Sequence, residues 1–209
     1  LGHGGYNADD DQTEYINAAK DATGTVKALD NDAGHSGKIM VTVTNGDLQF
    51  QAGRDAQTYV QLGHGGFSTR DAHSGEIDVN VSGGISFTAS VDIDDDTVNA
   101  NPGSNDQAYA QLGHGGYDAD GSHFGKITVT AGSFASGPEA GKGIVFRSGN
   151  WEDAYTQLGH GGTNSRTFGD ITAGGPEGLT GEITVQARGD ILFVAGTLHK
   201  DEGEITNND

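Results

Sequence analysis

The pentapeptide Leu-Gly-His-Gly-Gly occurs four times in this 209-residue chain, beginning at Leu1, Leu62, Leu112 and Leu158. A motif that returns every roughly 20–50 residues is typical of a solenoid, a propeller or another stacked array. Successive copies lie 61, 50 and 46 residues apart, so the spacing is uneven. Any fold proposed for the chain has to explain both the repeat and its uneven spacing.

Other shared landmarks reduce the units to a common core of about 37 residues. The additional residues fall mainly at three places, between His3 and His35, between Phe87 and Tyr109, and between Ile127 and Ile144. Insertions confined to loops on a fixed frame are what a solenoid tolerates. The repeats therefore run from about 1–61, 62–111, 112–157 and 158–209.

The first predicted strand of each unit alternates apolar and mostly polar residues. Side chains alternate faces along a strand, so the apolar set predicts one buried face. Its members are Ile39, Val41 and Val43; Ile77, Val79 and Val81; Ile127, Val129 and Ala131; and Ile183, Val185 and Ala187. Met40 is an exception among the residues between them.

Two shorter segments follow in the units. The second predicted strand has the form apolar-x-Phe, as in Leu48–Phe50, Ile85–Phe87, Ile144–Phe146 and Ile191–Phe193. The third has the form Tyr-x-Gln-Leu and leads into the pentapeptide. Its second residue varies among Val60, Ala110 and Thr156, which favours an outward position for that residue.

We expect a single all-β domain over 1–209, a three-sided parallel β-helix of about four repeat units with loop insertions. One unit cannot bury its apolar face alone, but stacked units form a continuous core.

Each repeat forms either one coil of the β-helix or two smaller coils. The outward position before the first strand holds Lys38, Glu76, Lys126 and Glu182, and this alternation of charge favours one coil, because opposite charges then lie ~4.7–4.9 Å apart. Segment 14–20 could form a helical turn.

Composition supports an elongated β protein over a disordered chain only together with this periodicity. The chain has 36 glycines, 3 prolines, 33% hydrophobic residues and a net charge of −19. Such a charge repels nucleic acid and anionic membranes.

There is no cysteine, and no run approaches the ~20 apolar residues of a membrane helix. We expect no membrane insertion. Because Leu1 begins within a repeat, we expect a piece of a longer protein.

The units also carry a family resemblance. Segments 75–89 and 181–196, together with Tyr-x-Gln-Leu-Gly-His-Gly-Gly, resemble repeats of filamentous-haemagglutinin-like exoproteins, which include very large bacterial surface proteins. The resemblance covers nearly the whole chain outside the insertions. It implies a right-handed parallel β-helix, export to the cell surface, and a structural or adhesive role. The secretion domain expected at the start of such proteins is not found in this sequence.

Histidine is the sharpest candidate for chemistry. His3, His64, His114 and His160 share one position of the repeat, and His35, His73 and His123 share a second, where the fourth unit has Leu179. A column of imidazoles could bind a transition metal. The alternative, which we favour, is that each ring caps a glycine-rich turn by bonding backbone groups.

Acidic loops are the second candidate. Asp94 and Asp96 lie in one acidic run, and Asp118 and Asp120 in another, and such loops can supply oxygen ligands to Ca²⁺. The remaining ligands of an EF-hand loop and the Gly-Gly-x-Gly-x-Asp nonapeptide are absent from the sequence, so solvated loops are favoured. Arg188-Gly189-Asp190 occupies a turn of the repeat and is interpreted as a turn rather than an integrin motif.

The sequence favours a structural protein over an enzyme. Some β-helices cleave polysaccharides with carboxylates on an outer face, but the outward positions here are mainly Thr, Lys, Glu, Gln and Asn. We expect a structural segment of an extracellular or cell-surface filament, stalk or adhesin, without catalytic residues or a required cofactor. A module that binds Ca²⁺ or another metal is the alternative, and a carbohydrate-active enzyme is the third. Expected partners are further repeats or copies stacked end to end, and surface glycans or proteins.

Overall fold

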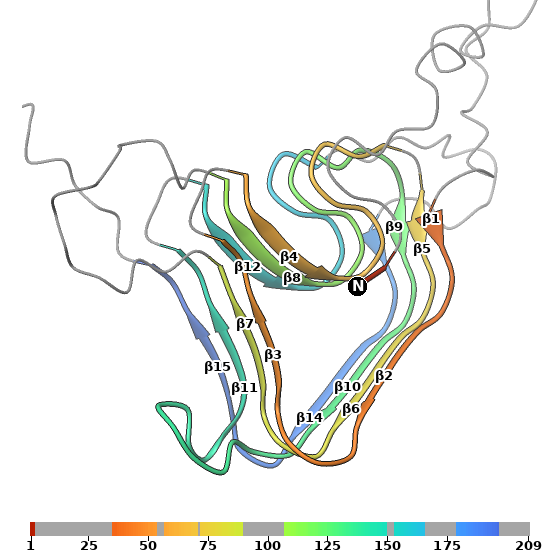
Figure 1. The fold of residues 1–209 in the computed structure, drawn as a ribbon. Helices are drawn as coiled ribbons and strands as arrows, with labels where there is room; N and C mark the ends of the chain where they lie inside the picture. The colour runs from red at the N-terminus through yellow and green to blue at the C-terminus, as the bar shows by residue number, and fades with distance from the viewer. Residues whose placement is uncertain are drawn as a thin grey trace, which may run out of the picture.

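The computed structural model describes residues 1–2, 35–53, 57–70, 72–89, 107–149, 153–165 and 179–196. Within these ranges the protein is all-β, with parallel strands stacked in four sheets and no helix (Figure 1). None of the described residues forms a helix that is long and apolar enough to cross a membrane.

Each repeat contributes one set of strands, which we call a coil. The first coil contains β1 (His35–Ser36), β2 (Ile39–Val43), β3 (Leu48–Gln51) and β4 (Tyr59–Leu62). The second contains β5 (His73–Ser74), β6 (Ile77–Val81), β7 (Ile85–Thr88) and β8 (Tyr109–Leu112). The third contains β9 (His123–Phe124), β10 (Ile127–Ala131), β11 (Lys142–Arg147) and β12 (Tyr155–Leu158). The fourth contains β13 (Leu179–Thr180), β14 (Ile183–Ala187) and β15 (Asp190–Val194).

Equivalent strands of consecutive coils pair directly. The sheet orders are β1-β5-β9-β13, β14-β10-β6-β2, β15-β11-β7-β3 and β12-β8-β4. Ile77 pairs with Ile39 on one side and with Ile127 on the other, and Ile127 pairs in turn with Ile183. No strand lies between these neighbours, so each repeat makes one coil.

The alternating charges lie where the one-coil prediction places them. Lys38 Nζ is 2.9 Å from a carboxylate oxygen of Glu76, and Lys126 Nζ is 3.5 Å from one of Glu182. All four side chains are about half exposed or more, so solvent screens each pair and its contribution to the stability of the stack is small. The alternating charges are therefore consistent with the register but contribute little to its stability.

The main core lies between the sheets of β2 and β3 and is closed by the sheet of β4 (Figure 1). It is built from the ladders that the sequence predicts, including Ile77, Val79, Ile85 and Phe87, all of which are buried. Phenylalanine rings stack along one ladder, with centroids 4.6–5.1 Å apart from Phe50 through Phe87 and Phe146 to Phe193.

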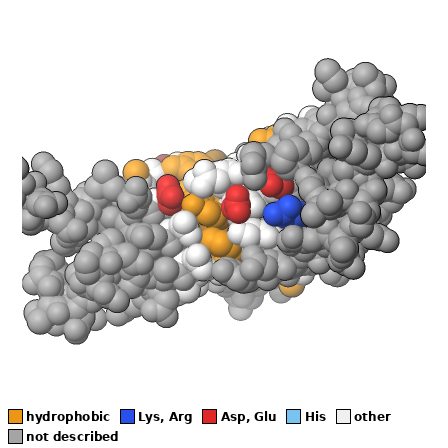
Figure 2. Space-filling model, turned by 90° about the horizontal axis from the view of Figure 1, so that it is seen from above, with side chains coloured by type: hydrophobic (Ala, Val, Ile, Leu, Met, Phe, Trp, Pro, Cys, Tyr) orange, Lys and Arg blue, Asp and Glu red, His pale blue; other side chains and the backbone are white. Residues whose placement is uncertain are grey.

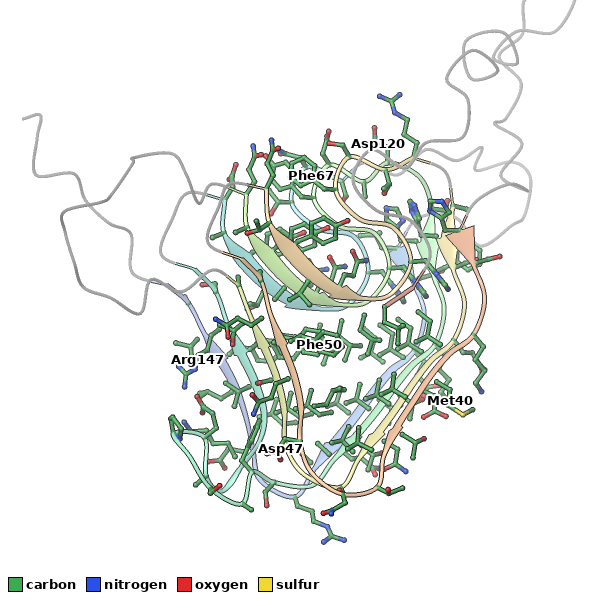
Figure 3. The ribbon with its side chains drawn as sticks, viewed as in Figure 1. Met40, Asp47, Phe50, Phe67, Asp120 and Arg147 are labelled. Atoms are coloured by element: carbon green, nitrogen blue, oxygen red, sulfur yellow. The ribbon has the colours of Figure 1, made fainter. Side chains whose placement is uncertain are left out.

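The structure contains a second, smaller core, which contradicts the predicted outward position of the residue between Tyr and Gln. Both faces of the β4 sheet are covered, and Figure 3 shows Phe50 on one side of it and Phe67 on the other. Ala110 and Val60 belong to the main core, so the prediction that this position points outward was wrong. Tyr109 packs instead with Phe67 and Tyr117 in a separate cluster. The reason is that the chain after each pentapeptide folds back over this sheet.

The insertion between β10 and β11 forms an ordered turn. The ring of Phe134 is buried and lies where a Cβ on Gly84 would be, at 2.1 Å. Glu139 accepts hydrogen bonds from Lys142 Nζ at 2.6 Å and from Arg147 Nε at 2.9 Å. The predicted helical turn at 14–20 lies outside the described residues.

Candidate functional site

The pentapeptide begins at the last residue of β4, β8 and β12, and its copies in adjacent coils stack very closely. A Cβ on Gly63 would lie 1.8 Å from the carbonyl oxygen of Gly113, and a Cβ on Gly113 would lie 1.8 Å from that of Gly159. Gly63 N–H donates to the Leu1 carbonyl oxygen at 2.9 Å, and Gly113 N–H to that of Leu62 at 3.0 Å. Glycine is required here because the backbones of adjacent coils touch.

The first histidine ladder lies immediately beside these glycines. The rings of His64, His114 and His160 are parallel to within 3°, with centroids 5.0 and 5.1 Å apart. Both ring nitrogens of His114 and of His160 have backbone partners. Nδ1 of His114 accepts from the His64 N–H at 3.0 Å, and Nε2 of His114 donates to the Gly75 carbonyl oxygen at 3.0 Å.

The pattern repeats along the ladder. Nδ1 of His160 accepts from the His114 N–H at 3.2 Å, and Nε2 of His160 bonds the Gly125 carbonyl at 2.9 Å. An Nδ1 that accepts leaves the proton on Nε2, so each of these rings is the neutral Nε2–H tautomer. Burial lowers the pKa of His114 to about 3 and also lowers that of His160. A metal could bind the His114 ring only if one of these hydrogen bonds broke.

The second ladder is made by His35, His73 and His123, with Leu179 in the fourth coil. Nε2 of His123 donates to the Ala119 carbonyl at 2.9 Å, so its Nδ1 is free to accept from Nδ1 of His73 at 3.0 Å. Nε2 of His73 is buried and has no hydrogen-bond partner in the described structure. Burial, with smaller contributions from His123, His35 and other histidines, lowers the pKa of His73 to about 2.

The repeated glutamines Gln61, Gln111 and Gln157 form a third ladder, which bonds the backbone of the pentapeptides. The Gln61 amide donates to the carbonyl oxygens of His64, Gly113 and Gly115, at 3.0–3.2 Å. Gln111 makes the equivalent three bonds in the next coil, and Gln157 donates to the His160 carbonyl at 2.8 Å. No role for this glutamine was predicted from the sequence. Its presence in all three Tyr-x-Gln-Leu segments was the signal.

Asp118 and Asp120 lie in the loop before the second histidine ladder, and the charge of Asp120 acts on His123, whose pKa is lowered mainly by burial. Asp118 adopts φ of 52° and accepts a hydrogen bond from Ser68 Oγ at 3.2 Å, while Asp120 is buried at 6% exposure in the same loop. Figure 3 labels Asp120 at the upper edge of the molecule. His3, Asp94 and Asp96 lie outside the described residues. Within the ranges that are described, no three His, Asp or Glu side chains converge in a way that could hold a metal ion.

The upper face of the molecule carries carboxylates beside hydrophobic side chains. Figure 2 shows acidic, basic and hydrophobic groups on the described part of this face, and no histidine. In the smaller core, the Tyr117 hydroxyl donates to Asp153 at 3.3 Å and accepts from the amides of Gln107 and Asn164 at 2.9 and 3.0 Å. The Tyr117 hydroxyl is therefore hydrogen-bonded within the protein.

No family model, curated protein or solved structure matches the chain. The resemblance to filamentous-haemagglutinin-like repeats consequently remains a prediction from the residues themselves. The repeated histidine and glutamine side chains bond backbone groups, and the repeated aromatic rings stack on equivalent rings of neighbouring coils.

Proposed function

We propose that this chain is a structural repeat segment of an extracellular filament, stalk or adhesin at the cell surface, and that it is not an enzyme. The observation that carries the proposal is the use of the repeat. The polar side chains that recur in the motif, His114 and Gln111, are fully buried and bond the backbone of adjacent coils. Residues that recur in order to join adjacent coils serve to extend the stack.

The expected handedness and shape belong to the same proposal. A right-handed, three-sided parallel β-helix is supported by the general right-handedness of parallel crossover connections and by the three long strands in each of the first three coils. One coil per repeat gives a rise of ~4.7–4.9 Å for each unit. Many repeats in series would then form a long, stiff rod whose outer loops vary freely.

Surface exposure of such a rod fits its chemistry. The net charge of −19 keeps the chain soluble and makes nucleic acid an unfavourable partner. Further repeats or copies stacked end to end, and glycans or proteins bound by the variable loops, are the proposed partners. A resident cofactor is not part of this proposal.

Surface labelling tests the proposal most directly. An antibody raised against the purified 209-residue chain should label intact cells of the source organism and mark elongated structures in electron micrographs. Treatment of intact cells with protease should remove the label. Labelling that requires permeabilised cells, or label on compact intracellular particles, would contradict a surface filament.

A further inference from the structure

The turn between β2 and β3 is longer than the equivalent turn of the next coil. Val43 pairs with Val81 at the end of one strand pair, and Leu48 pairs with Ile85 at the start of the next. Residues 44–47 therefore join the strands of the first coil, where only residues 82–84 join those of the second. Figure 3 labels Asp47 in this turn, near the lower edge of the molecule.

Asn45 is the additional residue of the turn. The Ser82 N–H donates to the Val43 carbonyl oxygen at 2.9 Å, and the Gly83 N–H donates to the Gly46 carbonyl oxygen at 3.0 Å. The ladder between the two turns thus passes Asn45 by. A side chain outside the ladder is free to change its rotamer while the strands on either side stay paired.

The turn lies open to water. Asn45 and Gly46 are both exposed, and a Cβ built on Gly46 would meet nothing within 4 Å. This exposure does not depend on the end of the stack, because Ser82 is also exposed in the second coil, which has a coil on each side.

An asparagine followed by glycine can react with its own backbone. The Gly46 nitrogen attacks Cγ of Asn45, so that an N–Cγ bond forms, the Cγ–Nδ2 bond breaks, and the amide proton leaves with ammonia. Water then opens the resulting succinimide at either carbonyl and gives isoaspartate or aspartate. The reaction consumes water, releases ammonia and needs no oxidant or reductant. Glycine favours the attack because it has no Cβ to hinder it and its backbone turns easily.

The described part of the chain holds two other asparagines, Asn80 and Asn164, and both are exposed. Asn80 lies within β6, and the residue after it, Val81, is fixed by pairing on both sides of the strand. The Asn164 amide donates to the Tyr117 hydroxyl at 3.0 Å, and the N–H that would attack it, that of Ser165, donates to the Gly162 carbonyl oxygen at 3.3 Å. Exposure is therefore shared, but freedom to react is not.

We propose that Asn45 is a site of spontaneous covalent modification, at which reaction with water converts the asparagine to isoaspartate and aspartate while the chain stays folded. The product adds a negative charge two residues before Asp47, whose carboxylate accepts the Gly84 N–H at 2.7 Å. The inference concerns the covalent state of one turn and does not depend on the proposed surface location.

Peptide mapping by mass spectrometry of the folded chain, incubated at physiological temperature, tests the proposal. The peptide that contains residue 45 should gain the mass difference between a hydroxyl and an amino group and should separate into an isoaspartate and an aspartate form. Its rate should rise from pH 6 to pH 8, because the Gly46 nitrogen has to lose its proton. The peptides that contain Asn80 and Asn164 should stay unchanged over the same period.

A synthetic peptide of residues 41–50 gives the rate without the fold, and the folded chain should convert at a comparable rate. A residue 45 that stays asparagine in the folded chain after the peptide has converted would overturn the proposal. Conversion to aspartate without isoaspartate would also overturn it, since direct hydrolysis does not pass through the succinimide.

Ser165→Gly is the matched variant, because it creates a second Asn-Gly pair in a turn where the asparagine amide is hydrogen-bonded. Asn164 should stay unmodified in this folded variant and should convert once urea unfolds it. If Asn164 converted in the folded variant as fast as Asn45, the dipeptide rather than the turn would select the site, and the proposal would fail.

Discussion

The buried His114 ring is held as a neutral hydrogen-bonding group by two backbone partners. The His114 ring accepts the backbone N–H of His64 from the neighbouring coil and donates to the backbone carbonyl of Gly75, which belongs to a different segment of the coil. An imidazole can therefore satisfy two backbone groups that the turn leaves without strand partners. The preferred prediction from sequence, that these rings bond backbone groups, is confirmed for this ladder.

His114→Asn tests that role at one residue. The shorter amide cannot span both partners, so we expect the free energy of unfolding to fall by about 1–3 kcal/mol, the cost of leaving a buried backbone group unsatisfied. Chemical denaturation measures this loss, and Thr42→Asn, at an exposed outward position, is the control. Zinc and copper titrations by calorimetry should be identical for wild type and variant. A clear loss of metal affinity would overturn the capping role.

The same ladders predict a dependence of stability on pH. Burial holds the pKa of His114 at about 3 and that of His73 at about 2, while an unfolded histidine titrates near ~6.5. Below pH ~6.5 the unfolded chain therefore binds protons that the folded chain does not. Stability is fully present above that pH and falls by up to ~1.4 kcal/mol per histidine for each unit of acidification.

Urea unfolding between pH 5 and 8 checks this sign, because the window lies above the ordinary pKa range of carboxylates. The midpoint should be flat from pH 7 to 8 and should drop towards pH 5. His123→Leu, which copies the natural Leu179 of the fourth coil, should reduce the slope below pH 6.5. A midpoint that rises on acidification would contradict the burial of neutral rings.

At the scale of the element, close backbone contact decides which glycines are essential. Gly113→Ala would place a Cβ 1.8 Å from the Gly159 carbonyl oxygen, and the φ of 149° already disfavours a side chain. We expect a loss of more than ~3 kcal/mol, well above the ~1–3 kcal/mol of backbone strain alone. Gly137→Ala isolates that strain, since its φ is 83° and nothing lies within 4 Å. Equal losses in thermal unfolding would contradict the close-contact argument.

The phenylalanine ladder makes a second prediction about elements, namely that one substitution has different effects in different coils. Phe87 is fully buried between two rings, so Phe87→Ala should reduce stability by about 3–5 kcal/mol. Phe193 is 56% exposed and stacks on one ring, so Phe193→Ala should cost well under half as much. Calorimetric unfolding compares the two. Similar losses would mean that Phe193 is covered in solution.

Sequence periodicity predicted the long strands because each presents one regular apolar face. Ile77, Val79 and Val81 alternate with polar residues and pair as expected, and the Lys38–Glu76 contact followed from the same register. The same periodicity did not predict the faces of the β4 sheet, because both of its faces are buried. Val60 and Ala110 face the main core while Gln61 and Gln111 face the smaller one, so alternation there does not separate inside from outside.

The candidate site was predictable only in part for a similar reason. Recurrence placed His64, His114 and His160 in one column, but it could not show which backbone groups the rings would meet. Those partners, Gly75 and Gly125, belong to a different segment of the coil and are brought close only by the fold. The acidic residues were judged from local composition alone, which carries no information about convergence in space.

At the scale of the whole molecule, every described coil contacts only its neighbours. Stability in such an array is approximately a sum of terms for each repeat and each interface, so length can grow without a new fold. The main core, the smaller core and the histidine and glutamine ladders all run parallel to the stacking direction (Figures 1 and 3). This arrangement depends on one coil per repeat, which is the central claim of the account.

Spin-label distances measure that claim directly. Thr42 and Gln186 lie on one outward column. In this column Thr42 pairs with Asn80, Asn80 pairs with Thr130, and Thr130 pairs with Gln186. Labels on cysteines at 42 and 186 should be separated by three rises, roughly 14–15 Å before the length of the label arms is added. Two coils per repeat would double this separation to roughly 28–30 Å. The shorter distance is the predicted result, and the longer one would contradict the account.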